Sequence, residues 1–582
     1  MLLPVSALAG EEATPFGLVY IGSNTGGASG GHCALRLGDV AFHFQVGEQG
    51  FLKLVRQPWQ EFLHCYNDIE NRPIYLAKTR LPSGQVARIE THFLKLLLAQ
   101  NRNFENLSAL ENEVRLLEGI EQGSDLALPV HRLGLFAWEA EPHECDETLL
   151  RLKKRVLDAL GKDFLQHIKT KALLALQDVD SRAETLEIPR SKTQLVPSLG
   201  VFFKRLQESL SLWAMVRVLD LSIPLRDEVL VDGGEILPSF RASLEGFARE
   251  LENSILALLS SKRPDKAEAL LLQMARLSAI RKGLSSGRLL MLDTFPQGCQ
   301  SVSYPKYRDD IEALNNLLKL LGKRLNEAQR RYSHHKSIHE PEFNYLENLA
   351  TRFWELKQAL SKKGPVRIWN GNTLPDRTLA VSLLSVGISV KGRPLGVKEA
   401  RDGLKRYERS IKRLYGYDIL NKNCVTELFS ALESCLGPGR FPKSTTVGIP
   451  FLGFKKWISQ MDVSKVEFYP SYRLRRLDEM YRGQNPLVVY LREFNTITSS
   501  IYHRNTVDTS FLLFSDDVLI PRPIYGCINV IYAGLNMAIG VLEAPFDKGA
   551  RFSQGGWGLV YSIPELFMVN IRKGTFAWVP PN

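Results

Sequence analysis

Apolar and polar positions divide this chain into stretches of different periodicity. Residues 16–21 form a short apolar run typical of a buried strand, and residues 34–37 and 40–44 are strand-like pieces around a Gly-Asp turn, which predicts a hairpin. Between about 146 and 365, apolar residues recur at every third or fourth position, which predicts a bundle of helices. The pattern therefore predicts an α+β protein with a large helical insertion.

Shorter segments flank these regions. Residues 59–66 and 85–99 are helical in pattern, on either side of a strand-like piece at 73–77, so they complete a small α+β lobe around the hairpin. Residues 397–415 predict a basic amphipathic helix. The uncharged run 378–390 is too short to span a bilayer, and we expect it to form buried strands beside the helix that carries the candidate nucleophile discussed below.

The C-terminal part mixes strand-like pieces with one long apolar run. Three pieces are strand-like, at 466–469, 487–490 and 510–514. Residues 524–542 are nineteen residues without a charge, but they include Asn529, Asn536 and three glycines. This run predicts a hairpin or helix buried against the core. Contact with a membrane, or a groove for an acyl chain, is the alternative.

Composition and charge narrow the class of partner. The 582 residues exceed what one core usually serves, and 44% hydrophobic with 24% charged residues is the balance of a globular protein. The net charge of +11 favours anionic partners. The chain lacks zinc-finger spacing, an RNA-binding aromatic signature and a Walker phosphate loop. We therefore expect no nucleic acid, and favour the anionic surface of a membrane or envelope.

The N-terminus carries a pattern of export. Residues 1–9 are apolar and end in Ala7, Leu8 and Ala9, the small-x-small pattern that signal peptidases cut. Because no basic segment precedes them, they predict the remnant of a truncated signal peptide. Export would place the chain in the periplasm or elsewhere in the cell envelope. Its seven cysteines are an odd number, so at least one thiol stays outside any intramolecular disulfide.

One cysteine stands at a predicted helix start. Asn423 is a good N-cap, because its side-chain oxygen can accept a backbone N–H left free there, and Leu428, Phe429 and Leu432 follow at helical spacing. Cys424 would then lie in the first turn, where the partial positive charge of the helix end favours the thiolate, which is the nucleophilic form. The alternative is a buried cysteine that packs as a small apolar residue.

Two histidines of the predicted hairpin could serve such a thiol. His32 begins the first strand and His43 lies near the end of the second, so we expect them to share a site. A histidine beside a cysteine can act as its base, while a second polar group holds the tautomer of the ring. Residues 27–31 also fit a Gly-x-Ser-x-Gly pattern, but this turn leads into a strand instead of a helix, so Ser29 is not expected to be a nucleophile.

A second pair of histidines raises the question of a metal. His335 and His339 are four residues apart and would share one face of a helix. The His-Glu-x-x-His pattern is missing, and basic neighbours would oppose a cation. We therefore expect neither a metal nor another cofactor.

The order of the hairpin and the cysteine helix resembles the circularly permuted papain-like thiol enzymes, the group that includes lecithin:retinol acyltransferase. In that group the histidine precedes the cysteine in the chain. The resemblance implies Cys424 as nucleophile, His32 as general base and His43 as the orienting third member. It also implies an oxyanion site at the backbone N–H of Cys424, supported by Asn423, with Tyr417 as a second donor.

The two ends of the chain are similar to a family of bacterial envelope proteins related to the Lnb-type lipoprotein N-acyltransferase, known from its N-terminal periplasmic domain. The similarity is carried by the runs Asn71–Leu76, Leu491–Ser499, Arg522–Gly526, Ala544–Asp547, Ser562–Leu566 and Asn570–Gly574. The membrane helices that follow the periplasmic domain in those acyltransferases have no clear counterpart in this sequence. The resemblance implies acyl transfer from a lipid donor.

These inferences divide the chain into five parts. Residues 1–9 are the signal remnant, 10–145 the N-terminal half of a permuted papain-like core with the histidine hairpin, 146–365 the helical insertion, 366–440 the second half of the core with the Asn-Cys helix, and 441–582 a mixed C-terminal region. The insertion could either cap the cleft or act as plain scaffold.

The expected function is that of a cysteine-dependent acyltransferase of the bacterial envelope. It would form an acyl-thioester on Cys424 and pass the acyl group to an amine such as a lipoprotein N-terminus. An anionic phospholipid or a lipoprotein would be its substrate, with peripheral membrane contact through Ile524–Leu542. The alternatives are a cysteine amidase or peptidase acting on peptidoglycan or peptides, and a non-catalytic envelope-binding protein.

Overall fold

The computed structural model of the chain describes residues 15–574 except for the segments 23–30, 139–144, 178–185, 264, 300, 305–310, 368–372, 389–395, 420, 438, 440, 443–447, 503, 505–507, 515–519, 568 and 572. The expected signal remnant at 1–9 and Ser29 lie outside the described residues. Within them the protein is mixed α and β, which is compatible with the expected α+β class.

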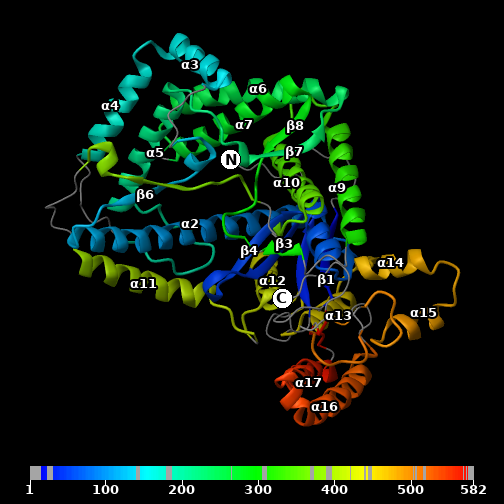
Figure 1. Cartoon of the computed structure of the whole chain (residues 1–582). Helices are drawn as coiled ribbons and strands as arrows, with labels where there is room; N and C mark the ends of the chain where they lie inside the picture. Colours follow the sequence, from blue (N-terminus) through cyan, green and yellow to red (C-terminus); the bar gives the residue numbers. More distant parts are fainter. Residues whose placement is uncertain are drawn as a thin grey trace.

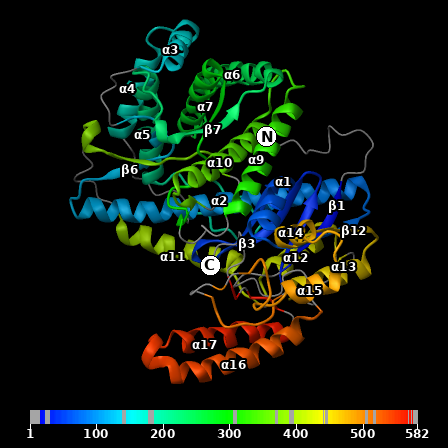
Figure 2. The same cartoon turned by 45° about the vertical axis from the view of Figure 1, so that its right-hand side comes forward.

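A six-stranded antiparallel sheet combines strands from the N-terminal part of the chain with one strand from its C-terminal part (Figures 1 and 2). Its order is β12-β5-β1-β2-β3-β4, so a C-terminal strand completes a sheet that is otherwise N-terminal. The strands are β1 (Phe16–Ile21), β2 (His32–Leu37), β3 (Val40–Val46), β4 (Leu52–Pro58), β5 (Ile74–Thr79) and β12 (Val463–Tyr469). The predicted hairpin is confirmed, because β2 pairs with β3 around a turn in which Gly38 has a φ of +58°.

Helices cover both faces of this sheet. One face packs against α2 (Ser83–Glu121), α12 (Cys424–Leu436) and α13 (Pro450–Gln460). The opposite face packs against α1 (Trp59–Leu63) and the π-helical turn η3 (His64–Ile69). Because side chains alternate along a strand, β2 sends Cys33 and Leu35 to the α12 face and Ala34 to the η3 face.

The region after α2 is mainly helical, as the periodicity predicts, and its helices share one large apolar core. The helices are α3 (Glu147–Leu160), α4 (Phe164–Gln177), α5 (Phe202–Asp220), α6 (Pro238–Leu259), α7 (Lys266–Ser286), α9 (Ile311–Tyr332) and α10 (Glu340–Lys362). Short two-stranded sheets, which the sequence pattern does not predict, lie among them: β6 (Ala127–Val130) with β11 (Leu379–Ser382), β7 (Leu230–Glu235) with β8 (Arg288–Leu292), and β9 (Ser301–Val302) with β10 (Val366–Arg367).

Two features of this region correct the sequence interpretation. The helix expected at 85–99 is part of α2, which runs for 39 residues and connects the sheet to the helical region. The run 378–390 does not lie beside α12, because β11 pairs with β6 and its Val381 is buried in the helical core. The amphipathic helix at 397–415 is confirmed as α11 (Val397–Tyr415), which packs along α2 (Figure 1).

The C-terminal region after β12 is helical, which differs from two of the predicted strands. Its elements are α14 (Tyr472–Met480), α15 (Pro486–Glu493), α16 (Arg522–Asp547), α17 (Ala550–Ser562) and the 3-10 turn η9 (Ile563–Phe567). The predicted strand at 487–490 is a helix, since Asn485 caps it and Pro486 is at its first position. The piece at 510–514 makes only an isolated bridge through Leu513.

The helices α16 and α17 lie side by side as a hairpin at one end of the molecule, far from the helical insertion (Figures 1 and 2). The prediction that residues 524–542 are buried against the core is wrong. They form most of α16, and its large aliphatic side chains are exposed to solvent.

Candidate active site

Asn423 and Cys424 form the helix start that the sequence predicts. Asn423 Oδ1 accepts hydrogen bonds from the backbone N–H groups of Val425 (3.0 Å) and Thr426 (3.1 Å). Thr426 Oγ1 in turn accepts from the backbone N–H of Asn423 at 2.9 Å, which completes a capping box. Cys424 is therefore the first residue of α12, and the predicted N-cap is confirmed.

The other half of the Asn423 amide fixes neighbouring segments. Its Nδ2 donates to the carbonyl oxygens of Ile419 (2.9 Å) and Gly448 (2.8 Å). Behind the cap, Leu428, Phe429 and Leu432 are buried against the sheet, as their spacing predicts. The start of α12 is thus held from three sides: by its cap, by the loop before it and by the segment that leads to α13.

The two histidines of the hairpin meet. His32 Nε2 lies 3.0 Å from His43 Nδ1, and His43 Nε2 lies 3.3 Å from Gln57 Oε1 on β4. An amide oxygen only accepts, so His43 carries its proton on Nε2 and its Nδ1 accepts from His32 Nε2–H. This arrangement leaves the Nδ1 lone pair of His32 as the basic nitrogen of the pair.

Aromatic rings and a guanidinium surround this pair on the η3 face of the sheet. The ring of Tyr66, in the π-helical turn, stacks on His32 at 5.7 Å, and Phe62 lies edge-on to His43 at 5.3 Å. The guanidinium of Arg72 lies over the Tyr66 ring at 5.4 Å. π-helical turns are rare and are frequently found at functional sites, which fits the place of this turn beside the histidines.

Cys424 reaches the start of β2 from the other face of the sheet. The backbone N–H of Cys33 acts to lower the pKa of Cys424, so the sulfur lies close to the peptide bond that joins His32 to Cys33. The structure thus brings the sulfur to the backbone next to His32. The imidazoles of His32 and His43 themselves lie on the η3 face.

Electrostatics differ from the expectation for the thiol. Burial raises the pKa of Cys424 above its ordinary value, although the N–H of Cys33 and the charge of Arg72 act in the opposite direction. The helix end does not outweigh burial, so the resting group is the neutral thiol. Burial, followed by the neighbouring His43 and the charge of Arg72, holds the pKa of His32 well below its usual range, so His32 is an unprotonated base at neutral pH.

His43 is held neutral in the same way. Its side chain is fully buried, and burial lowers its pKa to about 4, although the hydrogen bond that it donates to Gln57 acts to raise it. A neutral His43 can accept a hydrogen bond from His32 Nε2–H, and this bond holds the His32 ring in place. The site therefore combines a neutral thiol with a neutral imidazole base.

Arg72 is the residue that the sequence interpretation left without a role. It is only 3% exposed, and its Nε donates to the carbonyl oxygen of Gly22 at 2.7 Å while its Nη1 pairs with Glu70 at 3.0 Å. Its Nη2 is buried and has no hydrogen-bond partner among the described residues. Its charge acts on both Cys424 and His32, so a buried cation with a spare donor belongs to this site.

Tyr417 lies at the rim of the site. Its side chain is partly exposed, and its backbone N–H donates to the carbonyl oxygen of Gly50 at 3.0 Å. Burial, followed by the charge of Cys424, raises the pKa of its hydroxyl. The Tyr417 hydroxyl is thus close enough to Cys424 for a charge on the sulfur to change its pKa.

Gln57 and Tyr66 are site residues that the sequence analysis did not identify. A single glutamine or tyrosine in a strand or helix has no distinguishing pattern.

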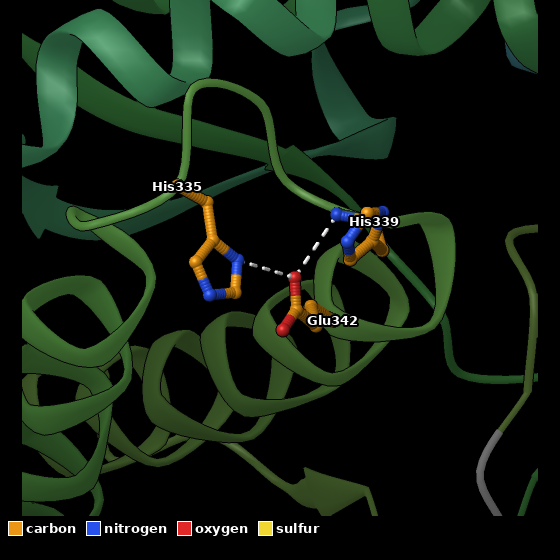
Figure 3. Close-up of side chains that lie close together, drawn as sticks. All are labelled: His335, His339 and Glu342. Atoms are coloured by element: carbon orange, nitrogen blue, oxygen red, sulfur yellow. Dashed lines mark hydrogen bonds and ion pairs between the residues drawn. The ribbon is translucent and has the colours of Figure 1, made fainter. Parts of the chain in front are cut away.

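The second histidine pair forms a separate cluster (Figure 3). His335 Nδ1 lies 3.3 Å from Glu342 Oε2, and single ligand atoms of His335, His339 and Glu342 lie within 4.8 Å of one another. The histidines do not share a helix face as predicted, since both lie before α10 and His339 caps it. Glu342 accepts from the backbone N–H of His339 at 3.0 Å, so its carboxylate already serves the capping box.

All seven cysteines are free thiols, so none of the described segments is joined by a disulfide.

Comparisons of the chain with models of protein families, with curated proteins and with solved structures find no match.

Proposed function

We propose that the chain is a cysteine-dependent acyltransferase of the bacterial envelope, with Cys424 as nucleophile, His32 as general base and His43 as the residue that orients it. We also propose that the sheet and α12 form a circularly permuted papain-like core. The similarity of the two chain ends to Lnb-type envelope proteins supports a lipid acyl donor and an amine acceptor such as a lipoprotein N-terminus. Residues 1–9 support an exported, periplasmic location.

One observation carries this proposal. The sulfur of a cysteine at a capped helix start lies near the backbone N–H of the residue after His32, and the His32 imidazole donates to a second, buried histidine. Most isolated cysteines pack as small apolar residues. Here the sulfur is instead surrounded by N–H donors and by the charge of Arg72, which are groups that stabilise a thiolate when the thiol loses its proton.

The chemistry follows from the protonation states. His32 takes the proton of the Cys424 thiol, and the sulfur attacks the carbonyl carbon of an acyl ester. As the tetrahedral intermediate collapses, the C–O bond breaks and His32 returns the proton to the leaving alkoxide, which leaves an acyl-thioester on Cys424. An amine then attacks the thioester and His32 accepts its proton. The C–S bond breaks to release an amide, and His32 returns this proton to the departing sulfur, which restores the thiol.

Arg72 and backbone N–H groups would stabilise the charge that develops. The spare Nη2 donor of Arg72 suits either the oxyanion or an anionic lipid headgroup. The thiol approaches β2 from the α12 face and the imidazoles lie on the η3 face. We therefore propose that the proton passes between Cys424 and His32 at the first residue of β2, directly or through one water.

The test is mass spectrometry of the purified protein after incubation with bacterial phospholipids. We expect an acyl-sized, hydroxylamine-labile adduct on the peptide that carries Cys424, absent in Cys424→Ser and greatly slowed in His32→Ala. Cys435→Ser on the same helix and His92→Ala on α2 are matched controls, because both residues are only partly buried and lie outside the site. Both controls should acylate at the normal rate.

Two results would contradict the proposal in different ways. An absent adduct together with a Cys424 that resists iodoacetamide at neutral and alkaline pH would make the cysteine structural and the chain a binding protein. An absent adduct with ready alkylation of Cys424 would keep a thiol enzyme and direct the search to peptide substrates, as for an amidase or peptidase.

A further inference from the structure

The hairpin of α16 and α17 has an unusual distribution of side chains. On α16 the large aliphatic residues recur every three or four positions along one exposed face, at Ile524, Ile528, Ile531, Leu535, Ile539 and Leu542. Leu542 is 77% exposed, and Phe546 at the end of the helix is 90% exposed. On α17, Phe552, Trp557 and Val560 are also exposed. A soluble protein normally buries such a stripe.

The buried face of α16 is polar or small instead. Asn529 is fully buried, where its Oδ1 accepts from the backbone N–H groups of Leu512 (2.9 Å) and Leu513 (2.8 Å). Asn536 is buried and accepts from Arg551 Nε at 3.2 Å. The helix is therefore reversed relative to a soluble amphipathic helix, with its polar groups inward and its aliphatic groups outward.

Small residues bring the two helices into close contact. A Cβ on Gly540 would lie 2.4 Å from the backbone nitrogen of Phe552, and a Cβ on Gly555 would lie 2.6 Å from that of Met537. Gly558 is similarly close to the backbone of Ser510 and to Ala533. Close packing through glycines is how helices associate in lipid, where large aliphatic side chains face outward.

From these three observations we infer that the hairpin of α16 and α17 is a lipid-binding element that inserts its aliphatic face into the surface of a phospholipid bilayer. No charged residue occurs between Ile524 and Leu542 or between Phe552 and Pro564, so neither face opposes insertion. The chain's net charge of +11 adds attraction to anionic lipids. The inference is independent of the chemistry at Cys424.

The lengths of the helices indicate insertion into one leaflet. Among the described residues, α16 is the single helix long and apolar enough to cross a membrane. Its partner α17 has 13 residues, about 20 Å, which is shorter than the hydrocarbon thickness of about 30 Å. Glu543 and Arg551 form an ion pair at the tip of the hairpin, and charges there favour the headgroup layer. Trp557 suits the same interface.

The test is flotation of the full chain with vesicles of phosphatidylglycerol and phosphatidylethanolamine. Ile531→Asp and Leu535→Asp place a charge on exposed positions, so they should fold normally, and each should bind vesicles at least about tenfold more weakly than the parent chain. The control is Leu174→Asp on α4, because Leu174 is 59% exposed and Leu535 is 60% exposed. That control should float as the parent chain does.

Two native cysteines give a second measurement that does not depend on a variant. Cys527 lies on α16 and Cys145 lies before α3, and both are exposed. With a membrane-impermeant maleimide and peptide mass spectrometry, vesicles should slow modification of Cys527 and leave Cys145 unchanged. Equal modification of Cys527 with and without vesicles, or equal flotation of all variants, would overturn the inference. Protection of Cys527 that grows with protein concentration, without lipid, would assign the face to a second copy of the chain instead.

Discussion

Replacing Asn423 tests whether the start of α12 is built to hold Cys424 in place. Its side chain makes four hydrogen bonds, two accepted from Val425 and Thr426 and two donated to Ile419 and Gly448. Each buried bond of this kind contributes about 1 kcal/mol net. Asn423→Ala removes all four, so local opening of the helix start should become easier by about 4 kcal/mol.

Asn423→Asp separates the two halves of this network. Aspartate keeps the oxygen that caps Val425 and Thr426, but it replaces the donor with an oxygen that faces the carbonyl groups of Ile419 and Gly448. The helix cap should survive while the two donated bonds are lost, which costs about 2 kcal/mol before any repulsion is counted. The aspartate variant should therefore lie between the parent chain and Asn423→Ala.

Amide hydrogen exchange gives the readout, because it measures local opening and needs no two-state unfolding of a long chain. Since about 1.4 kcal/mol corresponds to a factor of ten, exchange of the amides at the start of α12 should speed up about a thousandfold in Asn423→Ala and about thirtyfold in Asn423→Asp. Ser434→Ala, at the far end of the same helix, should leave these amides unchanged. An increase below tenfold in Asn423→Ala, or equal rates in the two variants, would refute the reasoning.

Three further predictions follow from the charged and titratable groups. The pKa of His43 falls from 6.5 in the unfolded chain to about 4 in the folded protein, so between these pH values only the unfolded chain binds a proton at this residue. The free energy of unfolding should therefore fall by up to about 3 kcal/mol as the pH drops from 6.5 to 4. An imidazole resonance of His43 that titrates near 6.5 in the folded protein would contradict this prediction. Arg72→Met removes a positive charge that lowers the pKa of Cys424, so alkylation of this thiol at neutral pH should slow, and Arg72→Lys should restore part of the rate. Arg276 forms an ion pair with Glu347 at 2.6 Å, and both side chains are buried. Arg276→Met would leave a buried carboxylate without its partner, so it should destabilise the helical region by about 3–5 kcal/mol in thermal unfolding. The double variant Arg276→Met with Glu347→Leu should recover most of this loss.

Local features of this chain could be predicted from its sequence, because their causes are local. The cap at Asn423, the Gly38 turn and the amphipathic helix α11 each depend on a few neighbouring residues. The meeting of His32 with His43 also follows from the register of one hairpin. The sequence therefore predicted these features correctly.

Features that depend on distant partners could not be predicted in this way. The sequence cannot show that β11 pairs with β6, because both pieces are short apolar runs that any buried edge would accept. The raised pKa of Cys424 arises from burial, which the helix-end argument ignores. The sequence interpretation identified the long apolar run of α16 correctly. Which face of α16 packs against α17 is decided by glycines whose contacts lie in another helix, so the exposed face could not be predicted.

The C-terminal region is joined to the candidate site through a short series of contacts. Tyr66 stacks on His32, and its carbonyl oxygen accepts from the backbone N–H of Arg72 at 2.9 Å. Oδ1 of the neighbouring Asn71 accepts a hydrogen bond at 2.6 Å from the backbone N–H of Arg473. Arg473 lies in the first turn of α14, the first of the C-terminal helices. The guanidinium of Arg473 lies over Phe514 at 5.4 Å.

The last link connects this aromatic ring to the hairpin. The backbone of Leu513, next to Phe514, is bonded to the side chain of Asn529 in α16. Packed and hydrogen-bonded groups of this kind have little freedom to move separately. If the aliphatic face of α16 rests on a bilayer, the sheet and Cys424 are held at a fixed orientation to that surface, and the helical insertion points away from it (Figure 2).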